Sequence, residues 1–140
     1  MSKIAVVFWS GTGNTESMAN AVADGAVSKG AEVKLFAASE FSADMMDEFD
    51  AVAFGCPAMG AEELEDSEFA PMFEACVPKL KDKKIALFGS YGWGDGEWMR
   101  TWEENCRNAG AFMPVEPVIV NDAPDDEGLN ACRALGAAIV

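Results

Sequence analysis

The chain has 140 residues, half of them hydrophobic, and its 24 acidic and 10 basic residues give a net charge of −14 with no histidine. This length predicts a single domain over residues 1–140. The charge disfavours nucleic acids and anionic membranes as partners, because their phosphates would be repelled, whereas a basic partner protein is compatible with it. No apolar stretch is long enough to span a bilayer and the N-terminus lacks a signal-peptide layout, so we expect a cytoplasmic protein.

Five segments predict β-strands. The first, third and fourth are almost wholly apolar, which is typical of strands that are buried on both faces. The second alternates apolar and charged side chains, and the fifth carries Pro114 and Pro117, which cannot donate to a sheet ladder and therefore favour an edge strand. In chain order these segments are 4–9, 32–37, 51–55, 85–89 and 112–120.

Helical patterns lie between the strands. Each places apolar residues three or four positions apart on one face, and two of them end at a glycine suited to a helix C-terminus, Gly30 and Gly110. Trp98 and Trp102 lie four positions apart on one such helix and are expected to pack in the core, while the role of Trp9 stays open. In chain order the predicted helices are 14–29, a shorter one at 42–47, 66–81, 95–109 and 125–140.

The alternation of strands and helices predicts the topology. Parallel strands joined by right-handed helical crossovers form a doubly wound α/β sheet. If the second and fifth strands are the edges, the strand order is 2-1-3-4-5, with helices on both faces. Ligands of such sheets bind beyond the carboxyl ends of the strands, where the strand order reverses. We therefore expect the functional site at three loops, residues 9–15, 56–66 and 90–96.

The four cysteines, Cys56, Cys76, Cys106 and Cys132, are far apart and contain no C-x-x-C pair. Because there is no histidine, a zinc or iron–sulfur site would need thiolates converging from all four positions. We expect no metal site, and free, buried cysteines in a reducing compartment.

The loop after the first strand predicts a phosphate site. Its two glycines let backbone amides turn inward, and the following helix N-terminus adds amides and a partial positive charge. A P-loop would need a lysine here, and a dinucleotide fingerprint would need a third glycine where Glu16 stands. Neutral donors suit a phosphate that anchors a cofactor without reacting; the alternative is a tight turn that only caps the helix. The loop comprises Ser10, Gly11, Thr12, Gly13, Asn14 and Thr15.

This loop resembles the phosphate loop of the flavodoxins, and two further segments, 55–60 and 88–96, resemble their flavin loops. Together the three segments look like the short-chain flavodoxins of anaerobic bacteria, over essentially the whole chain. The resemblance implies a low-potential electron-transfer protein that carries electrons between redox enzymes on non-covalently bound FMN. It implies use of the quinone, semiquinone and hydroquinone states and no small-molecule substrate of its own.

The resemblance also implies roles for residues of the second and third loops. Met59 and Trp93 match residues that cover the two faces of the flavin ring, and Glu62 matches a glutamate that accepts a hydrogen bond from flavin N3–H. The peptide after Gly60 matches one that flips so that its carbonyl meets N5–H in the semiquinone. Many relatives have a polar residue where Ala61 stands, so the energy of the flip is expected to differ here. The other implied cofactor-binding residues are Pro57, Ala58, Ser90, Tyr91, Gly92 and Gly94.

Other functions are known for this topology. An FMN-dependent NAD(P)H quinone or nitro reductase is the alternative, but it needs a nicotinamide site and a dimer interface, for which this chain has little room. A signalling receiver would need a phospho-acceptor aspartate after the third strand, where Gly55 and Cys56 stand. We therefore favour a monomeric electron carrier.

The charges are expected to be separated along the strands. Acidic residues follow the carboxyl ends of the predicted strands and lysines precede the strands, a pattern to which helix dipoles also contribute. A negative rim at the flavin edge would steer redox partners with basic docking surfaces toward it. The acidic groups are Glu62, Glu63, Glu65, Asp66, Asp95, Glu97, Asp122, Asp125, Asp126 and Glu127; the lysines are Lys3, Lys79, Lys81, Lys83 and Lys84.

Overall fold

The computed structural model describes residues 2–11, 13–60, 63–92 and 94–140. The strands are β1 (Lys3–Phe8), β2 (Glu32–Ala37), β3 (Ala51–Gly55), β4 (Lys84–Tyr91) and β5 (Val118–Asn121). The α-helices are α1 (Asn14–Ser28), α2 (Phe69–Cys76), α3 (Glu97–Asn108) and α4 (Asp126–Ala138). Short 3-10 helices are η1 (Ala38–Glu40), η2 (Ala43–Glu48) and η3 (Val77–Lys79).

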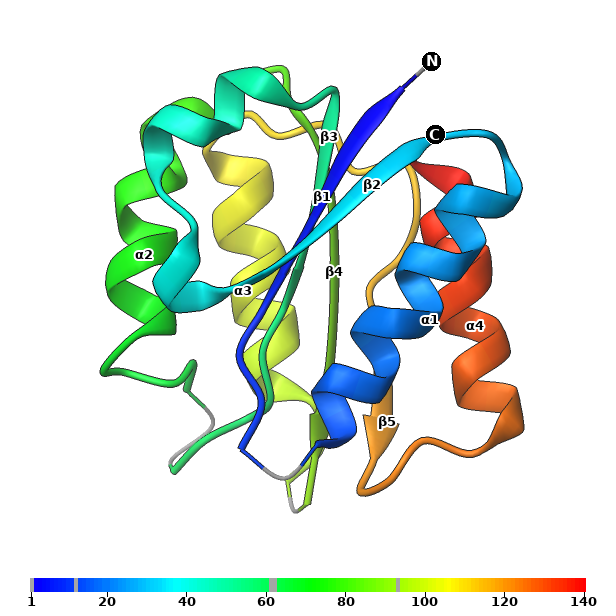
Figure 1. The fold of residues 1–140 in the computed structure, drawn as a ribbon. Helices are drawn as coiled ribbons and strands as arrows, with labels where there is room; N and C mark the ends of the chain where they lie inside the picture. The colour runs from blue at the N-terminus through cyan, green and yellow to red at the C-terminus, as the bar shows by residue number, and fades with distance from the viewer. Residues whose placement is uncertain (1, 12, 61–62, 93) are drawn as a thin grey trace.

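The strands form one parallel sheet in the order β2-β1-β3-β4-β5, as the sequence predicts. Helices α1 and α4 cover one face of the sheet, and α2 and α3 cover the other (Figure 1). The central strands alternate their side chains between these two layers. In β3, for example, Phe54 faces α2 and α3, whereas Ala53 faces α1 and α4. The doubly wound α/β fold is therefore confirmed.

The fifth strand is shorter than expected. The sequence pattern predicts a strand over 112–120, but β5 begins only at Val118, directly after Pro117. Phe112 forms an isolated bridge with Lys84, and the proline-containing segment that follows it leaves the sheet. A proline has no N–H for a ladder and a fixed φ, which explains why regular pairing is interrupted here.

The second long helix also differs from its prediction of 66–81. Helix α2 begins at Phe69, because the Glu65 carboxylate accepts hydrogen bonds from the N–H groups of the turn before it. It ends at Cys76 and continues as the 3-10 helix η3, which contains Pro78. The missing N–H of proline is compatible with this tighter terminal turn.

The four cysteines are free and buried, as expected. Within the described ranges, no group of His, Cys, Asp or Glu side chains has the arrangement of a metal site. None of the helices in the same ranges combines the length and hydrophobicity that crossing a membrane requires.

Candidate functional site

The sheet ladder continues past the strand ends and brings the three predicted loops together. The N–H of Trp9 donates to the carbonyl of Gly55 at 3.0 Å, which joins the end of β1 to the end of β3. The N–H of Ala58 donates to the carbonyl of Ser90 at 3.0 Å, which joins the loop after β3 to the end of β4. The loops therefore lie side by side at the carboxyl edge of the sheet, at the bottom of the view in Figure 1.

A cavity of about 250 Å³ opens between these loops. Apart from Trp9 and Asp122, all the residues that line it are among those predicted to bind the cofactor. The lining consists of Trp9, Gly11, Asn14, Pro57, Ala58, Met59, Ser90, Tyr91, Gly92 and Asp122.

A second cavity, of about 400 Å³, shares Trp9 and Gly11 with the first and is lined also by Ser10 and Gly13. Three other predicted site residues line neither cavity: Thr15 is buried, and Gly60 and Gly94 are exposed on the loops. Four more, Thr12, Ala61, Glu62 and Trp93, lie outside the described residues.

The first loop has the geometry of an anion cradle. Gly13 adopts a positive φ of 95° immediately before α1, and its N–H donates to Ser10 Oγ at 3.0 Å. No acceptor among the described residues takes the N–H groups of Asn14 or Thr15 or the hydroxyl hydrogen of Ser10. A helix N-terminus with neutral, unused donors suits a phosphate group, so these residues fit the phosphate of FMN.

A buried hydrogen bond connects the first loop to β4. Thr15, in the first turn of α1, and Ser90, in β4, are both buried, and their hydroxyl oxygens lie 3.3 Å apart in a hydrogen bond. Because Ser90 also lines the cavity, this bond links the phosphate loop to the wall formed by β4. The hydroxyl of Thr15, which we expected to face the ligand, thus has a partner inside the protein.

The second loop presents an apolar wall. Met59 is 37% exposed, and Pro57 and Ala58 line the cavity beside it. The backbones of Met59 and Glu63 exchange two hydrogen bonds, of 2.8 and 2.9 Å, which close the tip of the loop. Gly60 follows Met59 with a φ of 51°, a conformation that glycine adopts without Cβ strain. An exposed thioether beside apolar groups suits the face of a flat aromatic ring.

Glu65 does not lie on the exposed acidic rim, where the sequence predicts it. It is only 5% exposed, and its carboxylate accepts hydrogen bonds from the N–H groups of Ser67, Glu68 and Phe69 and from the Ser67 hydroxyl. Burial alone would raise the pKa of this carboxyl, but the hydrogen bonds from the Ser67 hydroxyl and the three N–H groups outweigh it and lower the pKa to about 2.

Two lining residues, Trp9 and Asp122, were not among the predicted cofactor-binding residues, although Trp9 lies in an expected site loop and Asp122 in the expected acidic rim. Trp9 directly follows β1, and its indole N–H donates to Glu68 Oε1 at 3.1 Å. Asp122 directly follows β5 with a φ of 58°, and its N–H donates to the carbonyl of Tyr91 at 2.7 Å. The available signal was their position after a strand end, at the edge where ligands of this fold bind. Trp98 and Trp102 are buried core residues, as expected.

Known proteins resemble this chain over nearly its whole length. A family model described as flavodoxin matches residues 6–136. The flavodoxin of Megasphaera elsdenii is 45% identical over 135 residues, which cover 96% of each chain. The flavodoxin of Clostridium beijerinckii is 46% identical over 121 residues, or 86% of this chain and 88% of that protein. The solution structure of two-electron reduced Megasphaera elsdenii flavodoxin superposes with a TM-score of 0.89 over 97% of each chain.

The chain belongs to the flavodoxin family. Like other flavodoxins, it binds FMN and transfers electrons between redox partner proteins, and it has no substrate of its own. The reductase alternative is not favoured, because the most similar proteins named above are flavodoxins rather than reductases.

Proposed function

We propose that the phosphate of FMN binds at the start of α1, in the loop formed by Ser10, Gly11, Thr12, Gly13, Asn14 and Thr15. The observation that carries this proposal is the set of unused donors at that helix N-terminus, namely the N–H groups of Asn14 and Thr15 and the Ser10 hydroxyl. They are neutral, and the loop contains no lysine. Such donors hold a phosphate without activating it for transfer.

We propose that the flavin ring lies between the second and third loops. Met59 would cover one face of the ring and Trp93 the other, while Glu62 would accept from its N3–H and Gly60 would contribute its carbonyl. The apolar cavity wall formed by Pro57, Ala58 and Met59 supports this assignment. When bound, FMN accepts and releases electrons one at a time. The remaining ring contacts would come from Ala61, Ser90, Tyr91, Gly92 and Gly94.

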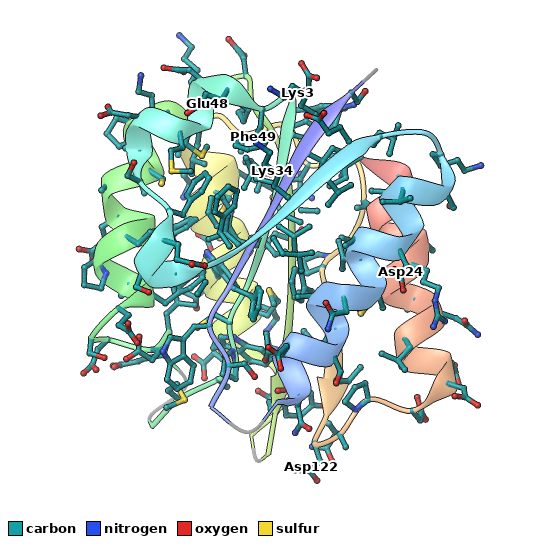
Figure 2. All side chains as sticks on the ribbon, in the orientation of Figure 1. Lys3, Asp24, Lys34, Glu48, Phe49 and Asp122 are labelled. Carbon is teal, nitrogen blue, oxygen red and sulfur yellow. The ribbon has the colours of Figure 1, made fainter. Side chains whose placement is uncertain are left out.

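We further propose that partners dock through basic surfaces at the loop end of the molecule. Exposed acids lie there, among them Glu63, Asp66 and Asp95, whereas lysines lie at the opposite end together with further acids such as Asp47 and Glu48. Figure 2 shows Lys3 and Asp122 at opposite ends of the sheet. We propose that the protein acts as a cytoplasmic monomer with a single domain over residues 1–140, in keeping with its negative charge and the match of the family model to residues 6–136.

The phosphate assignment is tested by comparing FMN with riboflavin, which lacks the phosphate. Flavin fluorescence quenching measures both dissociation constants for the apoprotein. Ser10→Ala should weaken FMN about tenfold, or by ~1.4 kcal/mol, and leave riboflavin unchanged. The control is Ser42→Ala, an exposed serine before η2 that lines neither of the two cavities. Equal losses for both flavins would refute the assignment, and a wild-type protein that takes up no FMN would refute the proposed function.

Partner docking is tested with cytochrome c, a basic one-electron acceptor, and ferricyanide, an anionic one. Raising the ionic strength should slow electron transfer to cytochrome c about tenfold, because screening removes electrostatic steering. The reaction with ferricyanide should instead become faster, since the repulsion is screened. Salt-independent rates with both acceptors would show that the acidic rim does not guide encounter.

A further inference from the structure

Two walls of the proposed FMN site are connected to the first turn of α2. The loop that carries Met59 enters this turn through Glu65, whose carboxylate binds the turn's N–H groups. The indole of Trp9, on the other wall, donates to the Glu68 side chain in the same turn. One short segment of the aromatic layer thus contacts both sides of the cavity.

Glu65 is the centre of this connection. Its Oε1 accepts from the N–H groups of Glu68 and Phe69, both at 2.8 Å, and its Oε2 accepts from the N–H of Ser67 at 2.9 Å and from the Ser67 hydroxyl. The backbone of Glu65 takes part as well, because its N–H donates to Cys56 Sγ at 3.4 Å. Residue 65 therefore links the end of β3 to the start of α2.

The redox loop, residues 57–64, lies between these two anchors. Cys56 and Glu65 close its base, and the paired backbones of Met59 and Glu63 close its tip. The base depends on a buried carboxylate, which would be costly to bury without its hydrogen-bond donors. Losing the carboxylate would leave several N–H groups at the start of α2 without an acceptor, so both the base of the loop and the helix end would loosen.

We propose that Glu65 is a positioning residue for the FMN site. Its hydrogen bonds to the first turn of α2 hold the redox loop so that Met59 lines the cavity and Gly60 stands at the flavin edge. This inference rests on the proposed placement of FMN. Glu65 acts by holding the redox loop in place through hydrogen bonds, whereas an acid at the rim acts on the flavin or a partner only through its negative charge.

Asp66 provides the control that separates geometry from charge. It is the next residue, it is exposed, and its carboxylate has no hydrogen-bond or ion-pair partner in the described part of the chain. Glu65→Gln and Asp66→Asn each remove one negative charge from almost the same place. Only Glu65→Gln disrupts the acceptor, because the glutamine amide group would point N–H groups at other N–H donors. Ser67→Ala is a third, milder variant that keeps both charges and loses one hydrogen bond to Glu65.

The experiment has three measurements on these variants. The FMN dissociation constant should rise about tenfold in Glu65→Gln, about threefold in Ser67→Ala and less than about twofold in Asp66→Asn. Amide exchange at Met59 and Glu63 in the apoprotein should accelerate about tenfold in Glu65→Gln, about threefold in Ser67→Ala and not at all in Asp66→Asn. At saturating FMN, Asp66→Asn should raise the potential of the first one-electron reduction, so that the first electron is easier to add. The same potential in Glu65→Gln should be about 59 mV lower than in Asp66→Asn, the equivalent of a tenfold change in a one-electron equilibrium.

Equal changes in Glu65→Gln and Asp66→Asn across all three measurements would overturn the inference, since charge alone would then explain them. If far-UV circular dichroism shows Glu65→Gln to be unfolded, Ser67→Ala decides, and an unchanged affinity and exchange rate in that variant would overturn the inference. A wild-type protein that failed to bind FMN would refute the proposed function instead, and the amide exchange of the apoprotein would still report on Glu65.

Discussion

The two faces of the sheet are packed by different means. The backbones of α1 and α4 are in close contact with each other. A Cβ added to Gly25 or Gly136 would lie only 1.9 Å from a carbonyl oxygen of the opposite helix. The face covered by α2 and α3 is instead filled by aromatic rings. Phe54 is at the centre of this cluster, with Phe73 5.1 Å away and Phe41 and Phe69 at 6.3 and 6.4 Å between ring centroids.

This difference extends to the loops that each face supports. The phosphate loop leads into α1 and is held by local bonds, such as that from Gly13 N–H to Ser10 Oγ. The redox loop leads into α2 and depends on Glu65, a buried charge between the aromatic core and the surface. The proposed phosphate loop is therefore built on the helix pair whose backbones are in close contact. The loop proposed to contact the flavin ring is held by side-chain interactions instead.

The largest expected effect is on the aromatic face. Phe54→Ala would remove a fully buried ring that contacts three others, and should lower the free energy of unfolding by about 3–5 kcal/mol. Urea denaturation followed by circular dichroism measures this loss. Phe112→Ala is the control, because Phe112 is largely exposed, and its loss should stay below about 0.5 kcal/mol. Similar losses in both variants would mean that the aromatic layer does not carry the stability of this face.

The helix pair on the other face is tested by adding volume. In Gly136→Ala the new methyl group would meet the carbonyl of Val22, so α1 and α4 must move apart, at a cost of about 1–3 kcal/mol in unfolding free energy. The same denaturation assay applies. Asn20→Ala, at an exposed position of α1, should be neutral or slightly stabilising because alanine favours helices. A Gly136→Ala protein as stable as the wild type would disprove the need for this close contact.

The sequence was sufficient for the fold because the strand signals were unambiguous. Apolar runs such as 51–55 predicted central strands, and Pro117 predicted an edge strand. The exact limits of β5 and α2 were wrong, since they depend on where a proline interrupts the ladder and on the Glu65 side chain, which binds the N–H groups at the start of α2. A sequence pattern does not show which carboxylate of an acidic run turns toward a helix start.

For the candidate site, the sequence located the loops that lie together around the cavity, but it did not show the direction of individual side chains. The cavity residues Pro57, Met59 and Ser90 follow from topology combined with the flavodoxin resemblance. Glu65 stands in a run of acidic residues, and the sequence offers no sign that its side chain turns inward. Its partners are N–H groups of a helix start, and every residue type supplies those.

Low pH should destabilise one face of the sheet before the other. Glu65 is a buried carboxylate on the aromatic face, whereas no carboxylate is buried on the α1 and α4 face within the described residues. Its pKa is lowered to about 2, so its contribution to stability is complete above the ordinary glutamate pKa and is lost as the pH falls toward 2. Amide exchange should therefore accelerate in α2 before α1 when the pH is lowered from about 5 to 2, after correction for intrinsic exchange rates. Glu65→Gln should remove this order, and simultaneous loosening of both helices in the wild type would contradict the assignment.

The smallest expected effect compares two glycines, one from each face. Gly60 in the redox loop and Gly30 after α1 both have positive φ, 51° and 88°, and an added Cβ at either would have no neighbour within 4 Å among the described residues. Replacing either glycine by alanine should therefore lower the free energy of unfolding only through backbone strain, by about 1 kcal/mol. Gly60→Ala should also make the first electron harder to add, by up to about 40 mV, because the resemblance implies that the peptide after Gly60 turns over at that step. Potentiometric titration measures this shift, and Gly30→Ala should leave the potential unchanged. Equal potentials in the two variants would mean that Gly60 provides a turn but does not tune the flavin.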